Sequence, residues 1–356
     1  IFRKKDFKII CFCCSPDRIT FFHFIEYIYK VPYRFLKKFS GNFIYKGFKK
    51  KIIYEYYVGK KNIDYSIKEK KITKLINNKE FKSKKFGRFK CYLFKVNSLY
   101  KEFKPSLVIG TGGYASAVPL MVAQLKSPRI PFILQEQNSF PGLTTRWFAK
   151  NAKLICSSFD ISKEINNERI VTTGNPIRNN IINGDKKSAL DEFELSIKKR
   201  TIFIFGGSQG SRFLNQSLSE VIKKINFKNI QILWQTGDKD FQKYAGLSNK
   251  NLRVVPFIND MASAYSLSDL VVCRSGALTL SEITACGKPS ILIPFAAAAG
   301  NHQLKNAETL SKKGASILIE EKDLNAKVLL LNINNLINNG SKLESMSKAS
   351  KNLGNP

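Results

Sequence analysis

The sequence predicts an α/β protein built from two doubly wound domains. Short apolar runs typical of buried strands alternate with helical patterns from residue 103 onward. Several of these runs end in Gly-rich turns that open a helix. The alternation breaks near residues 173–178 and restarts at residue 201, so it occurs twice. A length of 356 residues also suits two cores better than one.

In the first half, the orderly pattern begins with an apolar run that leads into the turn Thr111-Gly112-Gly113-Tyr114. The expected elements are a strand at 105–110, a helix at 115–125, a strand at 131–134, a helix at 141–151 and a strand at 154–157. The Gly turn at 111–114 either caps its strand or serves a site. The polar residues QEQN at 135–138 are either solvated surface or hydrogen-bonding groups for a ligand.

In the second half, strands are expected at 201–205, 230–235, 252–256, 270–273 and 289–294, with helices at 212–224, at 261–267 and after residue 276. We place an N-terminal domain at 1–172 and a C-terminal domain at 173–345. Residues 346–356 are expected to begin a truncated C-terminal segment. Two such Rossmann-like domains would leave a cleft between strand C-termini, where open α/β sheets bind ligands.

Residues 1–100 differ from the rest. They hold 26 Lys and Arg against seven Asp and Glu, and they are dense in aromatic residues. Strands are expected only near 8–13 and 52–58. The whole chain has a net charge of +32, which favours anionic partners such as a lipid surface. Compositional drift toward A+T-rich codons explains the same charge, so no nucleic-acid partner is inferred.

Two further classes of protein are disfavoured. The seven Cys are irregularly spaced and the chain has only two His, so no metal site is expected. The cysteines are expected to be reduced thiols in the cytoplasm. No run of about 18 apolar residues occurs, so no transmembrane helix is expected.

The most specific signal lies between residues 271 and 307. An apolar run ends at Arg274-Ser275-Gly276, a helical pattern carrying Glu282 follows, and His302, Gln303 and Asn306 open another helix. A strand, a Gly turn and a helix start together form an anion cradle from backbone N–H groups and the helix dipole. A carboxylate accepts from hydroxyls, and a sugar diol offers two of them. This combination predicts a site for a nucleotide or nucleotide sugar.

A second cradle is expected at GGSQGS, residues 206–211, where Gly206 and Gly207 allow close backbone approach and Ser208 adds a hydroxyl. Structural interpretations stay open for each motif. A Gly turn can serve packing alone, Glu282 can pair with a surface Lys, and a helix cap explains Asn301.

Taken together, these motifs resemble the MurG family of peptidoglycan glycosyltransferases. The matching pieces, spread over residues 103–345, are FKPSLVIGTGGYAS, FILQEQNSFPGLTTRWFAKNA, TGNPIR, FGGSQGSRFLNQ, WQTG, PFINDMASAY, CRSGALTLSEI and HQLKNA. The resemblance implies a GT-B fold, in which two doubly wound Rossmann-like domains face a central cleft and the donor binds mainly to the C-terminal one. It also implies transfer of N-acetylglucosamine from UDP-N-acetylglucosamine to undecaprenyl-diphospho-muramoyl-pentapeptide (lipid I), giving lipid II.

The family's donor contacts fall on Asn138, Arg178, Ser208, Ile258, Ala277, Leu278, Thr279, Leu280, Ser281, Glu282 and Gln303. Their chemistry suits these roles. Ser208 and the N–H groups of its loop suit the diphosphate, and Glu282 suits the ribose diol. The backbone of Ile258 suits uracil, and Gln303 suits the sugar hydroxyls. The resemblance implies no metal and no other cofactor. It also implies lipid I and an anionic membrane surface as partners, at the cytoplasmic face of the inner membrane.

One family motif is missing. The family begins with a GGTGGH loop whose Gly residues face the acceptor diphosphate and whose His is a candidate base, and residues 1–100 contain no such loop. His23 has about the right spacing from Gly112, but it lies between Phe22 and Phe24 in an aromatic run that also suits a packed histidine. The catalytic base is therefore unassigned. Two alternatives stay open: another UDP-sugar:lipid transferase of this fold, or a chain that binds the UDP sugar without turnover.

Overall fold

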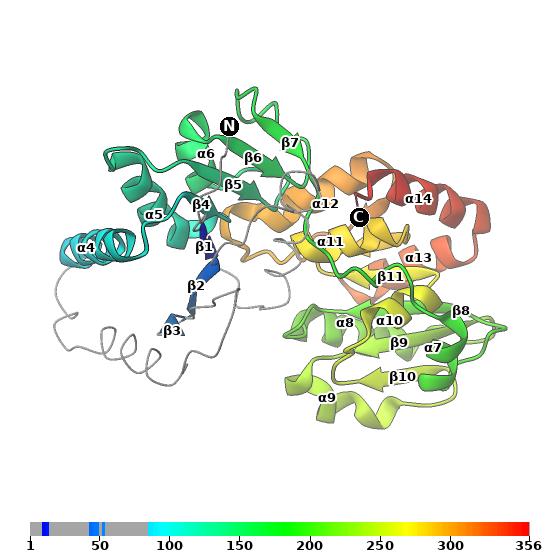
Figure 1. Cartoon of the computed structure of the whole chain (residues 1–356). Coiled ribbons are helices and arrows are strands. Elements are labelled where there is room, and N and C mark those ends of the chain that lie inside the picture. Colours follow the sequence, from blue (N-terminus) through cyan, green and yellow to red (C-terminus); the bar gives the residue numbers. More distant parts are fainter. Residues whose placement is uncertain (1–8, 14–42, 50–51, 54–84, 356) are drawn as a thin grey trace. The chain divides into compact units, whose positions relative to one another are not determined.

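A computed structural model describes residues 9–13, 43–49, 52–53 and 85–355 of the chain. It separates into two compact units, Ile1–Thr173 and Gly174–Pro356. The family-derived candidate His23 lies outside the described residues. Figure 1 shows the elements of both units.

The described residues of unit 1 form a sheet of seven strands in the order β3-β2-β1-β4-β5-β6-β7. All neighbours pair in parallel except β2 and β3, which are antiparallel. The strands are β1 (Ile9–Cys13), β2 (Phe43–Lys49), β3 (Ile52–Ile53), β4 (Leu107–Gly110), β5 (Phe132–Glu136), β6 (Leu154–Ser157) and β7 (Ile170–Thr172). The helices among these residues are α4 (Lys85–Phe103), α5 (Gly113–Leu125) and α6 (Leu143–Phe148), which continues as the 3-10 turn η2 (Ala149–Asn151).

The core of unit 1 explains helix α4, which the sequence pattern did not predict. Val96, Tyr100 and Phe103 recur at a spacing of three or four residues, so they lie on one face of the helix. All three are buried in a cluster with Leu120 of α5 and Phe132 of β5. The tertiary contacts therefore stabilise a helix whose Lys-rich sequence resembles a solvated loop.

Unit 2 contains a sheet of six strands, all parallel, in the order β10-β9-β8-β11-β12-β13. The strands are β8 (Arg200–Phe205), β9 (Ile230–Gln235), β10 (Leu252–Val255), β11 (Leu270–Cys273), β12 (Ser290–Leu292) and β13 (Ser316–Leu318). The helices are α7 (Lys186–Glu192), α8 (Arg212–Ile222), α9 (Asp238–Tyr244), α10 (Met261–Leu267), α11 (Ala277–Ala285), α12 (His302–Lys312), α13 (Ala326–Ile337) and α14 (Gly340–Leu353). Short 3-10 turns η3 (Ala245–Leu247) and η4 (Ala299–Asn301) follow α9 and precede α12.

Alternating side chains of β8 supply both faces of this sheet. Ile202 and Ile204 belong to the cluster that also holds buried residues of α8 and α13. Phe203 and Phe205 point the other way, and each ring contacts the ring of Tyr265 on α10. All five side chains are at most 4% exposed. A strand covered on both faces has a continuous apolar sequence, which is why TIFIF was predictable as a buried strand.

The strand order places the reversal of unit 2 between β8 and β11. From β8 the chain proceeds through β9 to β10 on one side, and from β11 through β12 to β13 on the other. The loops after β8 and β11 therefore diverge at the carboxyl edge of the sheet, where doubly wound folds bind ligands. These two loops are GGSQGS at 206–211 and RSG at 274–276.

The end of the chain packs on unit 2. Helix α14 runs without a break through residue 345, where the sequence pattern suggested a boundary. Beyond it, a Cβ added to Gly174 would lie 2.6 Å from the Asn355 carbonyl oxygen, and one added to Gly354 would lie 2.7 Å from the Thr284 oxygen. The last residues are thus in close contact with the start of unit 2 and with α11.

None of the described helices is long and apolar enough to cross a membrane. Within the same residues, no three His, Cys, Asp or Glu side chains come together as a metal site would require.

Candidate functional site

The loop between β8 and α8 has a backbone that only glycine accommodates. Gly207 and Gly210 have φ values of +89° and +72°. A Cβ on Gly210 would lie 2.2 Å from the Thr236 carbonyl oxygen, so this loop is pressed against the turn after β9. A Cβ on Gly207 would meet nothing within 4 Å, and Ser208 beside it is exposed. The loop thus presents backbone and a hydroxyl to an open side while its far end is fixed.

Gln235, at the end of β9, connects this loop to the predicted uracil position. Its Nε2 donates to the Gly207 carbonyl oxygen at 3.3 Å, and its Oε1 accepts from the Ile258 N–H at 2.9 Å. The Ile258 side chain is 4% exposed, so a ligand meets its backbone rather than its side chain. With the N–H already engaged, the carbonyl oxygen is the Ile258 group suited to accept from a base.

Helix α11 begins beside the Gly loop and carries six of the predicted contacts. Its N-cap is Gly276, which supplies no side-chain hydrogen bond, so the first N–H groups of the helix have no side-chain cap. Ala277, Leu278 and Thr279, half-buried, occupy this first turn. Leu280 is fully buried, and its N–H donates to the Gly276 carbonyl oxygen. Leu280 therefore contributes core packing, and residues 277–279 form the part of the helix start that is predicted to bind an anion.

Ser281 connects α11 to the start of unit 2. Its hydroxyl accepts from Asn175 Nδ2 at 3.1 Å and donates to the Ala277 carbonyl oxygen at 3.1 Å. These bonds commit the hydroxyl to holding the segment that leads to Arg178.

The Glu282 carboxylate is held by two partners and is 14% exposed. The Tyr265 hydroxyl donates to Oε2 at 3.1 Å, and the Arg178 Nε lies 3.9 Å from Oε1. Burial raises the pKa of Glu282, while the Arg178 charge and the Tyr265 hydrogen bond lower it in part. Arg178 itself donates to the Asn259 carbonyl oxygen at 3.1 Å. A carboxylate partly removed from water with one oxygen only loosely paired is a strong acceptor for hydroxyl groups.

Gln303 belongs to the first turn of α12. Its Oε1 accepts from the Phe295 N–H at 3.0 Å, and its carbonyl oxygen accepts from the Ser275 hydroxyl at 2.8 Å. The side-chain amide therefore has its NH₂ group left to donate. The neighbouring His302 ring Nδ1 lies 2.6 Å from the Ala299 carbonyl oxygen, a local contact that orders the helix start.

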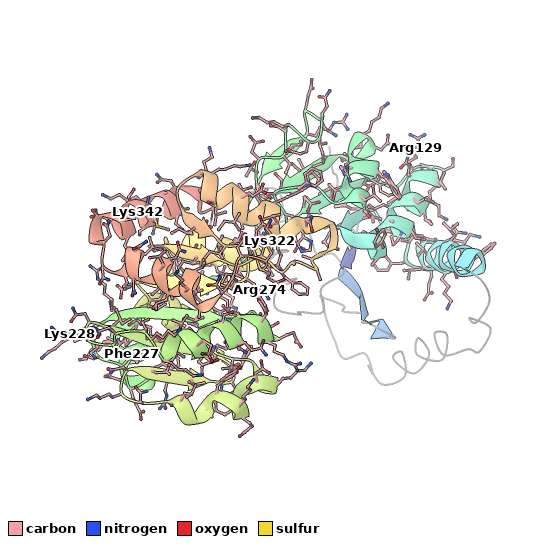
Figure 2. The ribbon with its side chains drawn as sticks, turned by 180° about the vertical axis from the view of Figure 1, so that it is seen from behind. Arg129, Phe227, Lys228, Arg274, Lys322 and Lys342 are labelled. Carbon is pink, nitrogen blue, oxygen red and sulfur yellow. The ribbon has the colours of Figure 1, made fainter. Side chains whose placement is uncertain are left out.

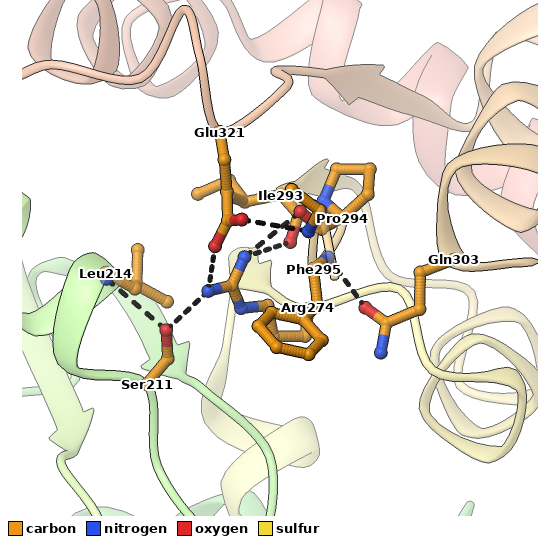
Figure 3. Close-up of polar contacts among 9 residues, drawn as sticks. Ser211, Leu214, Arg274, Ile293, Pro294, Phe295, Gln303 and Glu321 are labelled. Carbon is orange, nitrogen blue, oxygen red and sulfur yellow. Dashed lines mark hydrogen bonds and ion pairs between the residues drawn. The ribbon is translucent and has the colours of Figure 1, made fainter. Parts of the chain in front are cut away.

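Arg274 is a site residue that the sequence pattern did not single out. It is 8% exposed and lies inside unit 2, whereas Lys228 and Lys342 project from its surface (Figure 2). It donates to Ser211 Oγ at 2.7 Å and to the carbonyl oxygens of Ile293 and Pro294 at 3.2 and 3.1 Å (Figure 3). An Arg directly after a four-residue apolar strand was the available signal, because a buried charge requires partners.

The QEQN motif of unit 1 is mostly structural. Glu136 is 3% exposed, and its carboxylate accepts from the Asn138 and Gly142 N–H groups and, at 2.6 Å, from the Thr145 hydroxyl. Asn138 Nδ2 also donates to it, at 3.3 Å. The motif therefore folds its own loop, and Asn138, which is half-buried, stays a predicted contact. Gly112 and Gly113, with φ of +81° and +68°, form a turn after β4 whose backbone conformation favours glycine.

Known proteins match both units. Residues 45–157 match the glycosyltransferase family 28 N-terminal domain, and residues 201–355 match its C-terminal domain. The first match begins well inside residues 1–100, so the likeness is wider than the 103–345 that the motifs indicated. A crystal structure of MurG from Acinetobacter baumannii superposes with a TM-score of 0.70, over 98% of this chain and 96% of that one, at 23% identity, which supports the fold. Two Rossmann-like α/β units that match the two domains of this glycosyltransferase family define a GT-B glycosyltransferase.

Curated relatives show which glycosyltransferase family the chain belongs to. A UDP-N-acetylglucosamine–N-acetylmuramyl-(pentapeptide) pyrophosphoryl-undecaprenol N-acetylglucosamine transferase from Finegoldia magna is 41% identical over 308 residues, covering 84% of this chain and 82% of the relative. The enzyme of the same name from Flavobacterium psychrophilum is 38% identical over 268 residues, covering 74% and 72%. The chain belongs to this family of N-acetylglucosamine transferases, MurG.

Proposed function

We propose that this chain transfers N-acetylglucosamine from UDP-N-acetylglucosamine to lipid I and forms lipid II. The carrying observation is the set of groups at the carboxyl edge of the unit 2 sheet: an open Gly loop, an uncapped helix start and a half-shielded carboxylate. A diphosphate requires partners of the first two kinds, and a ribose diol requires a partner of the third kind. Membership in the family extends this chemistry to the sugar and acceptor in the relatives' name.

In this proposal, the diphosphate binds to the Gly206–Ser208 backbone, the Ser208 hydroxyl and the first N–H groups of α11. The ribose hydroxyls donate to Glu282, with Arg178 beside it, and uracil donates to the Ile258 carbonyl oxygen. The Gln303 amide donates to a sugar hydroxyl, and Asn138 contributes from unit 1.

The reaction is an inverting transfer in which a lipid I hydroxyl attacks the anomeric carbon and UDP leaves. Backbone N–H groups and the α11 helix end stabilise the negative charge that develops on the leaving diphosphate. They are fixed before the reaction by the packing of Gly210 and the Gln235 bridge, so little reorganisation opposes the transition state. A base must accept the hydroxyl proton, and none of the residues in unit 2 is assigned that role.

A product assay tests this function. The chain is incubated with UDP-[¹⁴C]N-acetylglucosamine and either lipid I or diacylglycerol in detergent micelles, and the radioactivity in the lipid phase is measured. Label should enter the lipid phase with lipid I and not with diacylglycerol. Label in diacylglycerol would favour another lipid acceptor. Donor binding without any transfer would favour the non-catalytic alternative.

We also propose that the chain acts on the cytoplasmic face of the inner membrane, bound to its anionic surface. The support is charge: residues 1–100 contribute 26 basic and seven acidic side chains, and acidic lipids attract such a segment. Sedimentation with anionic vesicles should show binding that weakens between 50 and 500 mM salt, because exposed charges are screened over about 8–10 Å at physiological salt. Equal binding to neutral vesicles would contradict the electrostatic part.

A further inference from the structure

The turn after β12 is held by two side chains that come from different parts of the chain. The Phe295 N–H donates to Gln303 Oε1 at 3.0 Å, and the next N–H, that of Ala296, donates to Glu321 Oε2 at 2.8 Å. Glu321 lies in the loop between β13 and α13. Two consecutive backbone groups are therefore fixed by one residue of the predicted sugar site and one residue outside it.

The other oxygen of Glu321 forms an ion pair with Arg274. Figure 3 shows Arg274 between Glu321 and Ser211, with the Phe295 ring alongside. The guanidinium lies 5.5 Å from the centre of that ring, and its Nη2 donates to Ser211 Oγ at 2.7 Å. Ser211 is the N-cap of α8 and the last residue of the Gly loop. A chain of direct contacts thus leads from Glu321 to both the Phe295 turn and the Gly loop.

This arrangement fixes the orientation of Gln303 at one end of the network and pairs Glu321 with Arg274 at the other. Because Gln303 Oε1 accepts from the Phe295 N–H, its NH₂ group has a defined direction only while that turn stays in place. The side chains of Glu321 and Arg274, taken without their backbone atoms, are 17% and 10% exposed, so neither charge is well solvated and each depends on the other. Removing the carboxylate would release the Ala296 N–H and leave the Arg274 charge with neutral partners alone.

We infer that Glu321 is a positioning residue for the donor sugar. It acts through the 295–296 turn on Gln303 and through Arg274 on the Gly loop, and it touches no substrate itself. This inference rests on the proposed function, because it assigns Gln303 to the sugar and the Gly loop to the diphosphate. Sequence alone offers no reason to choose Glu321 over its neighbour Glu320.

Glu320 provides the matched control. It pairs with Lys322 at 3.3 Å and its side chain is 39% exposed. Glu320→Gln therefore makes the same charge change one residue away without touching the Arg274 network.

The experiment measures dissociation constants of the full chain for UDP and for UDP-N-acetylglucosamine by calorimetry. Glu321→Gln should weaken binding of the sugar nucleotide about tenfold and binding of UDP about threefold or less. The sugar-dependent gain, which is the ratio of the dissociation constant for UDP to that for UDP-N-acetylglucosamine, should therefore become smaller. Glu320→Gln should bind both ligands within about twofold of the unchanged chain. A sugar-dependent gain that Glu321→Gln leaves intact overturns the inference.

A double-mutant cycle sharpens this result. Gln303→Ala removes the amide that Glu321 is inferred to orient, so adding Glu321→Gln to it should reduce the sugar-dependent gain no further. Full additivity would show that the two residues act separately and would refute the coupling.

Glu321→Asp is the second variant should the Gln variant fold poorly. It keeps the charge, but its shorter side chain reaches either Arg274 or the Ala296 N–H, so it should lose part of the same gain. An unchanged chain that fails to bind UDP-N-acetylglucosamine contradicts the proposed function itself. If the chain without substitutions binds UDP-N-acetylglucosamine and both Glu321 variants bind it equally well, only this inference is contradicted.

Discussion

Replacing Glu282 is the most direct test of the donor site. Its Oε2 accepts from Tyr265, while Oε1 lies 3.9 Å from Arg178, so Oε1 has lone pairs to accept a ribose hydroxyl. A hydrogen bond to a charged group contributes about 1.5–3 kcal/mol. Glu282→Ala should therefore raise the dissociation constant of UDP-N-acetylglucosamine by about 10- to 150-fold.

The Ala variant also leaves the buried Tyr265 hydroxyl without its acceptor, which costs about 1–3 kcal/mol of stability. Glu282→Gln keeps that acceptor and so separates binding from folding. Calorimetry with both variants should show the loss for UDP and a much smaller loss for 2′,3′-dideoxy-UDP, which lacks the hydroxyls. Equal losses for the two ligands, or unchanged affinity for UDP, would refute the assignment of Glu282 to the ribose.

Three further outcomes follow from the same contacts. Gly210→Ala should lower the free energy of unfolding by about 2–4 kcal/mol in a urea titration, because its Cβ would meet the Thr236 oxygen at a left-handed φ; wild-type stability would show that the loop can move. Tyr265→Phe should weaken donor binding about three- to tenfold, and adding it to Glu282→Gln should weaken binding no further. Additive losses in the double variant would count against a shared role. Since burial raises the pKa of Glu282 in the folded state, its charge destabilises the fold above that pKa. Glu282→Gln should therefore have the higher Tm at pH 8, by an amount that shrinks as pH falls through the folded pKa, and a constant difference would disprove this.

The sequence predicted the central strands because each is buried on both faces. The runs at 201–205 and 270–273 have no polar interruption that would make them ambiguous, and they became β8 and β11. The edge strands β7 and β13 were missed because each has three residues and at least one half-buried position. Helix α7 was missed because only Ala189 and Leu190 are buried in it, so its pattern resembles a solvated loop.

Within the site, local motifs were predictable and their partners were not. GGSQGS marks a loop whatever surrounds it, because Gly207 and Gly210 have positive φ values that favour glycine. Tyr265 and Glu321 reach the site from other elements, at sequence separations that no local pattern encodes. Leu280 lies within a motif of predicted contacts and is fully buried, so its side chain packs in the core and its place in the donor site stays a prediction.

The close approach of Gly174 to Asn355 means that unit 2 begins and ends at one place. A segment whose ends meet can be rewired without stretching the chain. A linker of a few residues could join residue 355 to residue 174, and new ends could be opened in the exposed turn at 248–250. Such a circular permutant would keep every donor contact in unit 2 while moving both termini away from α11. It would also allow a reporter domain to be attached just before β10, at the amino edge of the sheet and away from the predicted nucleotide-binding edge. This would turn the donor half into a module for sensing UDP sugars.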